Sequence, residues 1–316
     1  MYSIQVVFAP LGTQSIVIAH RGCSALRPEH TMSAYKLAIE QGAEYIEPDI
    51  VSTKDGVLIA RHENEISETT NVADHAEFAD RKKTKSIDGS AVTGWFTEDF
   101  TLAEIKTLRA KERLGGLRKA NQAFNDTDAI PTAAEVFALA KQRGVGVYPE
   151  TKHPAYFKSI NLPLEAKLVK LLADAGFGDG KNAFIQSFET ENLKELKRMT
   201  KIPLVQLMQG QGGPADGGSY AAMSTPDGLK TLRSYASGIG VEKSMIYGTS
   251  LLADAHRAGL LVHAWTFRPE AMFVLKEFRG DARAELRWFL HKGVDGIFVD
   301  LPEQAIQARK NVLIQD

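Results

Sequence analysis

The sequence predicts an α/β fold, a closed (β/α)8 TIM barrel with an inserted subdomain after the second strand. Short β-branched runs alternate with helical segments in what can be counted as eight strand–helix units, and eight such units favour a barrel over an open doubly wound sheet. One long polar stretch, residues 63–129, interrupts this alternation. We therefore predict a single domain over residues 1–316, with residues 63–129 as an insertion within it.

Turn and capping residues set the boundaries of the predicted elements. Thr31 caps the first helix and Gly42 ends it. The pair Asp55-Gly56 predicts a turn that leads into a short strand at residues 57–60. The predicted barrel strands cover residues 16–19, 43–50, 145–149, 183–186, 202–207, 238–241, 260–265 and 294–299. The helices that follow them cover residues 31–41, 132–142, 164–175, 189–199, 227–235, 249–258, 281–291 and 302–310.

The insertion contains one clear helical signal, a capping box at Thr101 and Glu104 that predicts a helix over residues 102–109. We expect its basic cluster at residues 81–85 to form a solvated face. A second irregular stretch, the Gly-rich residues 209–218, lacks the glycine spacing of a phosphate-cradling motif and predicts a flexible loop.

Composition excludes several function classes. The formal net charge of −1 gives no electrostatic attraction to nucleic acid or to an anionic membrane. No stretch reaches the roughly 20 apolar residues that span a bilayer, so we expect no stable membrane insertion. Cys23 is the only cysteine, which rules out an internal disulfide and fits a reducing compartment. We expect Cys23 to fill space rather than to act as a nucleophile.

Residues 1–10 have no basic region and only a short apolar stretch, so they do not resemble a signal peptide. We expect a cytoplasmic location for the chain as given, and a periplasmic one if a leader was removed. The sequence leaves the oligomeric state open, a homo-oligomer included.

Polar side chains recur at the ends of the predicted strands, which is where barrel enzymes carry their functional groups. A solvated surface would scatter such residues, whereas here they concentrate at one end of strand after strand. This concentration predicts an active site at the barrel mouth. The residues are His20, Arg21, Glu47, Asp49, Glu150, Lys152, Gln186, Gln206, Trp265 and Asp300.

Three of these residues suggest a metal site. Glu47 and Asp49 lie two apart on a strand, so their side chains share a face, and adjacent carboxylates repel unless a cation or a shared proton lies between them. With Glu150 they form an all-oxygen set that suits one divalent cation, Ca²⁺ or Mg²⁺, better than zinc. The alternative is a structural ion pair with Arg21 or Lys152.

His20 and His62 flank the pair Glu47 and Asp49 in the sequence, and we favour acid–base roles for them over capped loop positions. Gln186 and Trp265 are candidate substrate contacts at strand ends, although a core position suits Trp265 equally well. Three other histidines lie near the motifs without a predicted role: His30, His153 and His263.

Taken in order, these motifs resemble the glycerophosphodiester phosphodiesterase family. The resemblance extends over nearly the whole chain, and the insertion is similar to that of the longer, periplasmic bacterial members. The matching segments are Ala19-His20-Arg21-Gly22, Pro28-Glu29-His30-Thr31, Glu47-Pro48-Asp49, Asp55-Gly56 with His62, Pro149-Glu150-Thr151-Lys152 and the closing Gly293 to Glu303.

The resemblance implies a barrel enzyme that hydrolyses glycerophosphodiesters, such as glycerophosphocholine and glycerophosphoethanolamine, to sn-glycerol 3-phosphate and an alcohol. It implies that His20 and His62 are the general acid and base, and that Arg21 and Lys152 hold the phosphate. Glu63 follows His62 where the family usually has Asp. The divalent cation would be bound by Glu47, Asp49 and Glu150.

The sequence leaves three rival functions to weigh. A phospholipase of the phosphatidylinositol or sphingomyelin type would need an exposed apolar rim, and no basic amphipathic segment of that kind is present. An aldolase-like enzyme would use Lys152 as a Schiff-base lysine, which three nearby carboxylates would keep protonated. A phospho-ligand binding protein would bind without turnover. We expect substrate choice to lie in residues 63–129 and 209–218.

Overall fold

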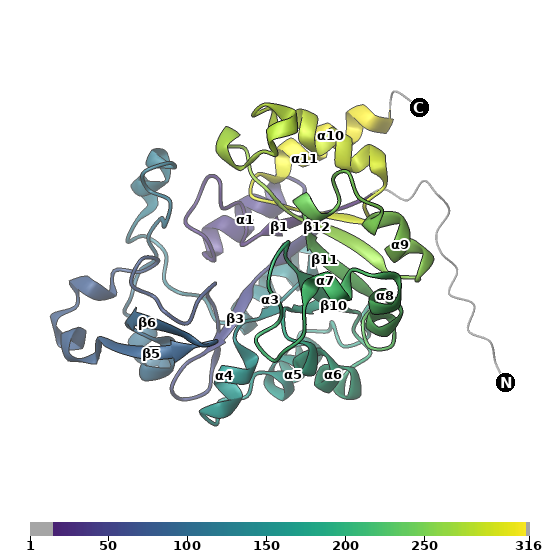
Figure 1. The fold of residues 1–316 in the computed structure, drawn as a ribbon. Coiled ribbons are helices and arrows are strands. Elements are labelled where there is room, and N and C mark those ends of the chain that lie inside the picture. The colour runs from purple at the N-terminus through teal and green to yellow at the C-terminus, as the bar shows by residue number, and fades with distance from the viewer. Residues whose placement is uncertain (1–14, 314–316) are drawn as a thin grey trace.

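The computed structural model describes residues 15–313, in which parallel strands close into a barrel surrounded by helices (Figure 1). The first strand pairs with both the second and the last, and this double pairing closes the sheet. The predicted TIM barrel is therefore confirmed. Its strands are β1 (Ile16–His20), β2 (Tyr45–Glu47) continued by β3 (Asp49–Ser52), β7 (Gly146–Val147) continued by β8 (Glu150–Thr151), β9 (Ile185–Ser187), β10 (Leu204–Met208), β11 (Gly238–Glu242), β12 (Leu261–Phe267) and β13 (Gly296–Val299).

The second and third barrel strands are each interrupted at a proline. Pro48 separates β2 from β3, and Pro149 lies between β7 and β8, because a proline has no N–H to give to the sheet. The pairing nevertheless continues across both breaks, with Tyr45 opposite Gly146 and Asp49 opposite Glu150. The prediction of single strands over residues 43–50 and 145–149 missed these interruptions.

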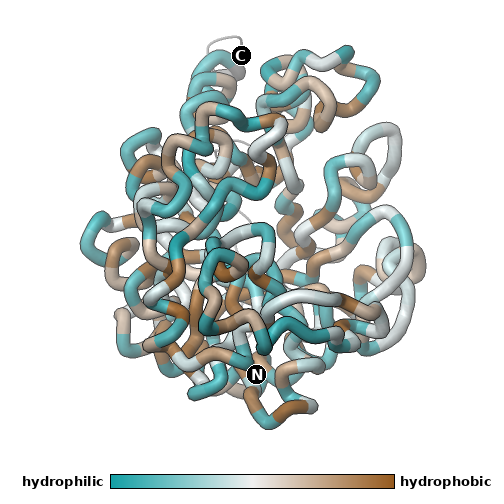
Figure 2. The backbone as a smooth tube through the Cα atoms, turned by 90° about the vertical axis from the view of Figure 1, so that its left-hand side faces the viewer, coloured by the Kyte–Doolittle hydropathy of each residue, from teal (hydrophilic) through white to brown (hydrophobic). Residues whose placement is uncertain are grey.

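Helices cover the outside of the barrel, and Figure 2 shows hydropathy changing at short intervals along them, as expected for helices that bury one face. The predicted caps are present: the Thr31 side chain accepts a hydrogen bond from Ala34 N, and Gly42 has a φ of 90°. The barrel helices are α1 (Met32–Glu40), α3 (Ala133–Arg143), α5 (Glu165–Asp174), α6 (Thr190–Met199), α8 (Pro226–Arg233), α9 (Leu251–Arg257), α10 (Ala282–Lys292) and α11 (Pro302–Leu313), with shorter helices α4 (Pro154–Ser159) and α7 (Tyr220–Met223) in the loops.

The barrel interior is filled below its mouth by a small cluster of buried side chains, Ile18, Tyr148, Val205 and Phe298. His263 belongs to this layer, since its Nδ1 lies 2.7 Å from the Tyr148 hydroxyl, and burial lowers its pKa to about 4. Side chains alternate along a strand, so the next inward-facing positions lie two residues further on. At this spacing, His20, Glu150 and Asp300 follow Ile18, Tyr148 and Phe298, which places these polar side chains at the barrel mouth.

Residues 63–129 add no strand to the barrel and carry a separate hairpin, drawn at the left of Figure 1. The hairpin pairs β5 (Lys83–Ile87) with β6 (Ser90–Gly94) around an Asp88-Gly89 turn. It was not predicted, because its strands carry few apolar residues to produce an alternating pattern. The domain division into 1–316 with an insertion at 63–129 stays a prediction.

Two further predictions within the insertion need correction. The helix expected over residues 102–109 is α2 (Leu102–Ile105) only; the chain beyond it is held by a bridge between Arg109 and Ala129. The basic cluster is only partly solvated, because Arg81 donates to Glu104 and Lys85 pairs with Glu98.

The expectation about residues 1–10 and a leader lies outside the described residues. Among the helices of residues 15–313, none is long and apolar enough to cross a membrane.

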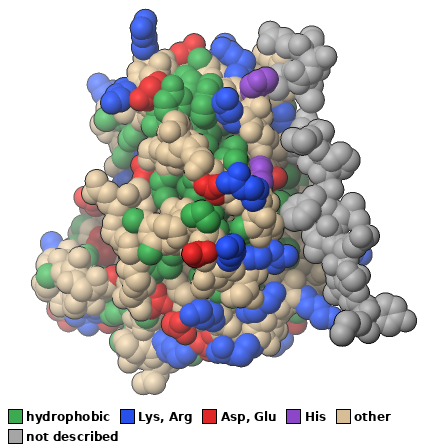
Figure 3. All heavy atoms as spheres, turned by 45° about the vertical axis from the view of Figure 1, so that its right-hand side comes forward, with side chains coloured by type: hydrophobic (Ala, Val, Ile, Leu, Met, Phe, Trp, Pro, Cys, Tyr) green, Lys and Arg blue, Asp and Glu red, His purple; other side chains and the backbone are tan. Residues whose placement is uncertain are grey.

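On the outer face drawn in Figure 3, basic and acidic side chains are interspersed.

Gly22 provides a test of how tightly the loop after β1 packs on α1. Its φ is 85°, and a Cβ there would lie 2.8 Å from the Cβ of Ala34. Gly89 has a similar φ of 81° with nothing within 4 Å, so it is a matched control for backbone strain alone. Gly22→Ala should lower the free energy of unfolding by about 1–3 kcal/mol more than Gly89→Ala, measured by urea denaturation with chelator present. Equal losses would contradict the packing argument.

Candidate active site

A cavity of about 460 Å³ lies at the barrel mouth. Phe188 and Arg268, which were not predicted, also contribute to its wall. Of the residues with a predicted catalytic, phosphate-binding or metal-binding role, Asp49 is the one that does not line the cavity. It lies directly behind the wall, beside Glu47 and Glu150. The predicted residues that do line the cavity are His20, Arg21, Glu47, His62, Glu150, Lys152, Gln186 and Trp265.

The three predicted metal ligands come together. One carboxylate oxygen from each of Glu47, Asp49 and Glu150 lies within 4.8 Å of the others, and all three residues are buried. Glu47 accepts hydrogen bonds from Arg21 N at 2.8 Å and from Gln186 Nε2 at 3.0 Å. These donors fix the orientation of the Glu47 carboxylate.

Burial and mutual repulsion disfavour the charged forms of Glu47 and Glu150. Burial, Asp49 and Glu150 hold the pKa of Glu47 well above its usual range. Burial also raises the pKa of Glu150 to about 7, with Asp49 adding to the effect and Lys152 opposing it.

The donor set fits a divalent cation. Asp49 Oδ2 is bonded to His30 Nε2 at 2.9 Å, whereas Asp49 Oδ1 is buried with no hydrogen-bond partner among the described residues. Three buried carboxylates with an unpartnered oxygen offer the hard, all-oxygen ligation that Ca²⁺ and Mg²⁺ prefer.

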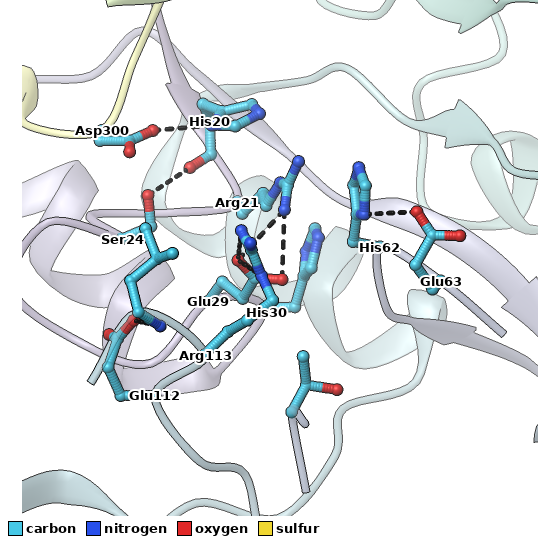
Figure 4. A network of polar contacts seen from close by, with 12 residues as sticks. His20, Arg21, Ser24, Glu29, His30, His62, Glu63, Glu112, Arg113 and Asp300 are labelled. Carbon is cyan, nitrogen blue, oxygen red and sulfur yellow. Dashed lines mark hydrogen bonds and ion pairs between the residues drawn. The ribbon is translucent and has the colours of Figure 1, made fainter. Parts of the chain in front are cut away.

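The two predicted acid–base histidines stand on opposite sides of Arg21, each bonded to a carboxylate (Figure 4). His20 Nδ1 lies 2.7 Å from Asp300 Oδ1. Burial and Arg21 lower the pKa of His20 to about 4, against the opposing effect of Asp300. A hydrogen bond from Nδ1–H to Asp300 leaves Nε2 free to act on a ligand.

His62 repeats this arrangement from the end of β4 (Leu58–Ala60). Its Nδ1 lies 2.8 Å from Glu63 Oε1, and its Nε2 lies 3.4 Å from Lys152 Nζ. Burial, Arg21 and Lys152 lower the pKa of His62 to about 3. Glu63 also pairs with His153 at 2.8 Å, so the Glu63 carboxylate contacts both His62 and His153.

Arg21 and His30 show what the motif at residues 28–31 does. The Arg21 guanidinium pairs with Glu29 at 3.1 Å, and Glu29 pairs in turn with Arg113 of the insertion at 2.9 Å. His30 supports Asp49 and is itself bonded to the Tyr35 hydroxyl at 2.7 Å. Glu29 and His30 therefore hold the side chains of Arg21 and Asp49 in place.

The comparisons with known proteins agree with this geometry. The model of the Glycerophosphoryl diester phosphodiesterase family matches residues 20–304. The chain belongs to this family. It is 38% identical over 310 residues to a glycerophosphodiester phosphodiesterase of Arabidopsis thaliana, covering 90% of this chain and 82% of that protein. It is 27% identical to a glycerophosphodiester phosphodiesterase of Haemophilus influenzae, covering 98% and 94%.

Solved structures of glycerophosphodiester phosphodiesterases share the fold. One from Agrobacterium tumefaciens has a TM-score of 0.63 at 22% identity and covers 92% of this chain and 99% of that one. A phosphodiesterase from Oleispira antarctica, in complex with the product sn-glycerol-3-phosphate, has a TM-score of 0.63 at 21% identity and covers 94% and 97%. The family model and the relative at 38% identity confirm the family and the enzyme class expected from the sequence.

One residue expected at the mouth is elsewhere. Gln206 points away from the cavity and bonds to the carbonyl of Phe188 and the hydroxyl of Tyr235. Its neighbours Val205 and Leu207 face inward, and strand alternation then sends Gln206 outward. Cys23 is buried, and burial raises its pKa to about 12, which suits a space-filling role.

Several site residues were missed by the sequence analysis. Asp300 stood among the strand ends without a role, although it follows Phe298 by two positions and thus faces the same way. Phe188 follows Gln186 by the same spacing. Arg268 and Arg113 come from irregular segments, for which the sequence carries no comparable signal.

The raised pKa of Glu150 predicts how the cation-free protein responds to pH. The folded state holds this proton up to about pH 7, against 4.5 for an ordinary glutamate. The folded state therefore binds more protons than the unfolded state between these values, and stability falls as pH rises, by up to about 3 kcal/mol.

The Glu150→Gln variant should lack this part of the decline. Unfolding by urea in the presence of chelator, at pH 5 and pH 7.5, measures the difference between variant and unsubstituted protein. Ca²⁺ or Mg²⁺ should restore the stability of the unsubstituted protein at pH 7.5 more than that of Glu150→Gln. The same pH slope in both proteins would contradict the account.

Proposed function

We propose that this protein hydrolyses glycerophosphodiesters such as glycerophosphocholine and glycerophosphoethanolamine to sn-glycerol 3-phosphate and an alcohol, with a divalent cation and two histidines. The observation that carries the proposal is the pair of carboxylate-bonded histidines, His20 and His62, flanking a cavity over three buried carboxylates. The product named in the Oleispira antarctica complex belongs to the same chemistry.

Glu47, Asp49 and Glu150 would hold the cation, which we propose is Ca²⁺ or Mg²⁺. When bound, it supplies positive charge that polarises the phosphoryl group and stabilises the charge that builds on its oxygens. The protein residues supply the rest of the site.

Arg21 and Lys152 are suited to hold the phosphate. Although burial works against both charges, Glu29 and Asp49 keep the pKa of Arg21 above its usual value, and Glu150 and Asp49 do the same for Lys152. Both side chains are fixed by these partners before substrate arrives. Placed charges of this kind can each contribute on the order of 3 kcal/mol to a transition state.

The histidines would divide the proton transfers. One accepts a proton from the attacking oxygen, and the other donates a proton to the leaving alkoxide, so they must be in opposite protonation states. Both have low pKa values, and a phosphate anion bound beside them would favour protonation of one. The attacking oxygen belongs either to water or to the glycerol hydroxyl next to the phosphate.

The charged state of Lys152 also bears on the Schiff-base alternative. A Schiff-base lysine must be neutral to attack a carbonyl, and Glu150, 3.0 Å from Lys152 Nζ, favours the ammonium form. The site therefore favours phosphodiester hydrolysis.

Cytoplasmic location of the chain as given stays a prediction.

The direct test is release of sn-glycerol 3-phosphate from glycerophosphocholine after chelation, and then with Ca²⁺ or Mg²⁺ restored. His20→Ala and His62→Ala should each lower kcat by about 10²–10⁴-fold. His75→Ala is the control, since His75 lies in the insertion and its side chain forms a hydrogen bond only with Glu77 among the described residues. Full activity in either active-site variant would contradict the proposal.

Replacing Asp300 by Asn tests which histidine is the base. Asp300 raises the pKa of His20, so Asp300→Asn should lower that pKa and reduce kcat on the order of 10²-fold through loss of His20 orientation. If His20 is the base, the acid limb of the pH–kcat profile moves to lower pH; if it is the acid, the alkaline limb does.

An unchanged pH profile with unchanged kcat would contradict a positioning role for Asp300. Because Asp300 also pairs with Arg118 at 2.6 Å, the folded state of the variant must be checked by circular dichroism and urea denaturation.

A further inference from the structure

A second cavity adjoins the active-site cavity, and three residues line both. Its volume is about 660 Å³, including space open to solvent, and Glu150, Lys152 and Phe188 line both cavities. The outer walls come from the two irregular regions of the chain, with Asp88 from the hairpin turn and Gln209 from the Gly-rich loop. A group esterified to a phosphate held at Lys152 could therefore extend into this second cavity.

Glu189 is the unusual residue in this wall. It is 4% exposed, and its Oε2 accepts a hydrogen bond from Ala155 N at 3.0 Å. Within residues 15–313 it makes no ion pair, and its Oε1 accepts no hydrogen bond. Burial raises the pKa of Glu189 to about 7, and Asp88 and Asp216 add to the effect. A buried carboxylate without a cation is costly unless a ligand supplies one.

The cations that line the cavity already pair with other carboxylates, and Lys152 pairs with Glu150 at 3.0 Å. His153 lies 2.6 Å from Asp88 and 2.8 Å from Glu63, so its positive charge is already shared by two carboxylates. Asp216, in the Gly-rich loop, accepts a hydrogen bond from Glu191 N on Oδ2, while its Oδ1 is buried with no partner among the described residues. Neither Glu189 nor Asp216 is neutralised by a side chain of residues 15–313.

The shape and chemistry of the cavity favour an organic cation over a metal ion. Across the described residues, only Glu47, Asp49 and Glu150 bring three potential ligand atoms within 4.8 Å of one another, so no three acidic side chains of this wall converge on one ion. The wall also carries two aromatic rings, Phe188 and Tyr220, with centroids 6.3 Å apart and planes at 67°. Aromatic faces together with carboxylates are a good environment for an alkylammonium group.

We propose that the second cavity binds the cationic head group of the substrate, an ammonium-bearing alcohol of the choline or ethanolamine kind, and that Glu189 determines this specificity. Asp216 supports the same charge from the Gly-rich loop. This inference rests on the proposed phosphodiesterase function. It also gives a physical reason for the earlier expectation that residues 63–129 and 209–218 set substrate choice.

The test compares a cationic substrate, glycerophosphocholine, with a neutral-head-group substrate, glycerophosphoglycerol. The unsubstituted protein should favour the first in kcat/KM. Glu189→Gln keeps an acceptor for Ala155 N and removes the charge, so it should lower the ratio of kcat/KM values between the two substrates by about tenfold, through KM. Asp216→Asn, in an irregular loop, should shift the ratio in the same direction.

The matched control is Glu195→Gln on the outer side of α6, where Glu195 pairs with Lys158, and it should leave the ratio unchanged. Equal loss on both substrates in Glu189→Gln would mean that Glu189 only supports α4, and would overturn the inference. A lack of preference in the unsubstituted protein would overturn it as well.

Binding of choline chloride, measured by calorimetry against sodium chloride at equal ionic strength, separates this inference from the proposed function. The unsubstituted protein should bind choline, and Glu189→Gln should bind it about tenfold more weakly. If neither diester is hydrolysed but choline binding follows Glu189, the proposed function fails and the cation site stands. If choline binds equally to both proteins or to neither, the cation site fails.

Discussion

The repulsion between three buried carboxylates is the constraint on which the site depends. Glu47, Asp49 and Glu150 are brought together because β2–β3 and β7–β8 run side by side, with Asp49 paired opposite Glu150. Such a cluster is unfavourable by itself, and the surrounding residues reduce that cost without removing it. Arg21 contacts both Glu47 and Asp49, and one member each is contacted by His30, Lys152 and Gln186. The remaining unpartnered oxygen of Asp49 is what a divalent cation would use.

Buried contacts with carboxylates also orient the two histidines that we propose as the acid–base pair. His20 and His62 come from different strands, yet each has its Nδ1 bonded to a carboxylate and its pKa lowered by burial. His20 Nε2 is thereby left for the ligand, whereas His62 Nε2 lies 3.4 Å from Lys152 Nζ. Arg21 stands between the two histidines and is held by Glu29. A substrate would therefore meet charges and proton carriers that are already oriented, which is how enzymes stabilise transition states without reorganisation.

The sequence alone predicted which side chains reach the barrel mouth wherever they lie on a regular strand, because side chains alternate between the two faces of a strand. A barrel strand with inward residues at every second position predicts that His20 and Glu47 reach the mouth, and the same rule, applied more strictly, would have excluded Gln206 and included Phe188. Irregular segments gave no such rule. The β5–β6 hairpin has few apolar residues, and Arg268 reaches the cavity through a loop conformation that depends on tertiary contacts.

The central claim is that the three carboxylates form one divalent-cation site. Equilibrium dialysis of the chelator-stripped protein against Ca²⁺ and against Mg²⁺, with the bound ion counted per chain, tests it most directly. The account predicts one ion per chain for at least one of these cations, and loss of that ion in Asp49→Asn. No saturable binding of either ion, or equal binding by Asp49→Asn, would contradict it.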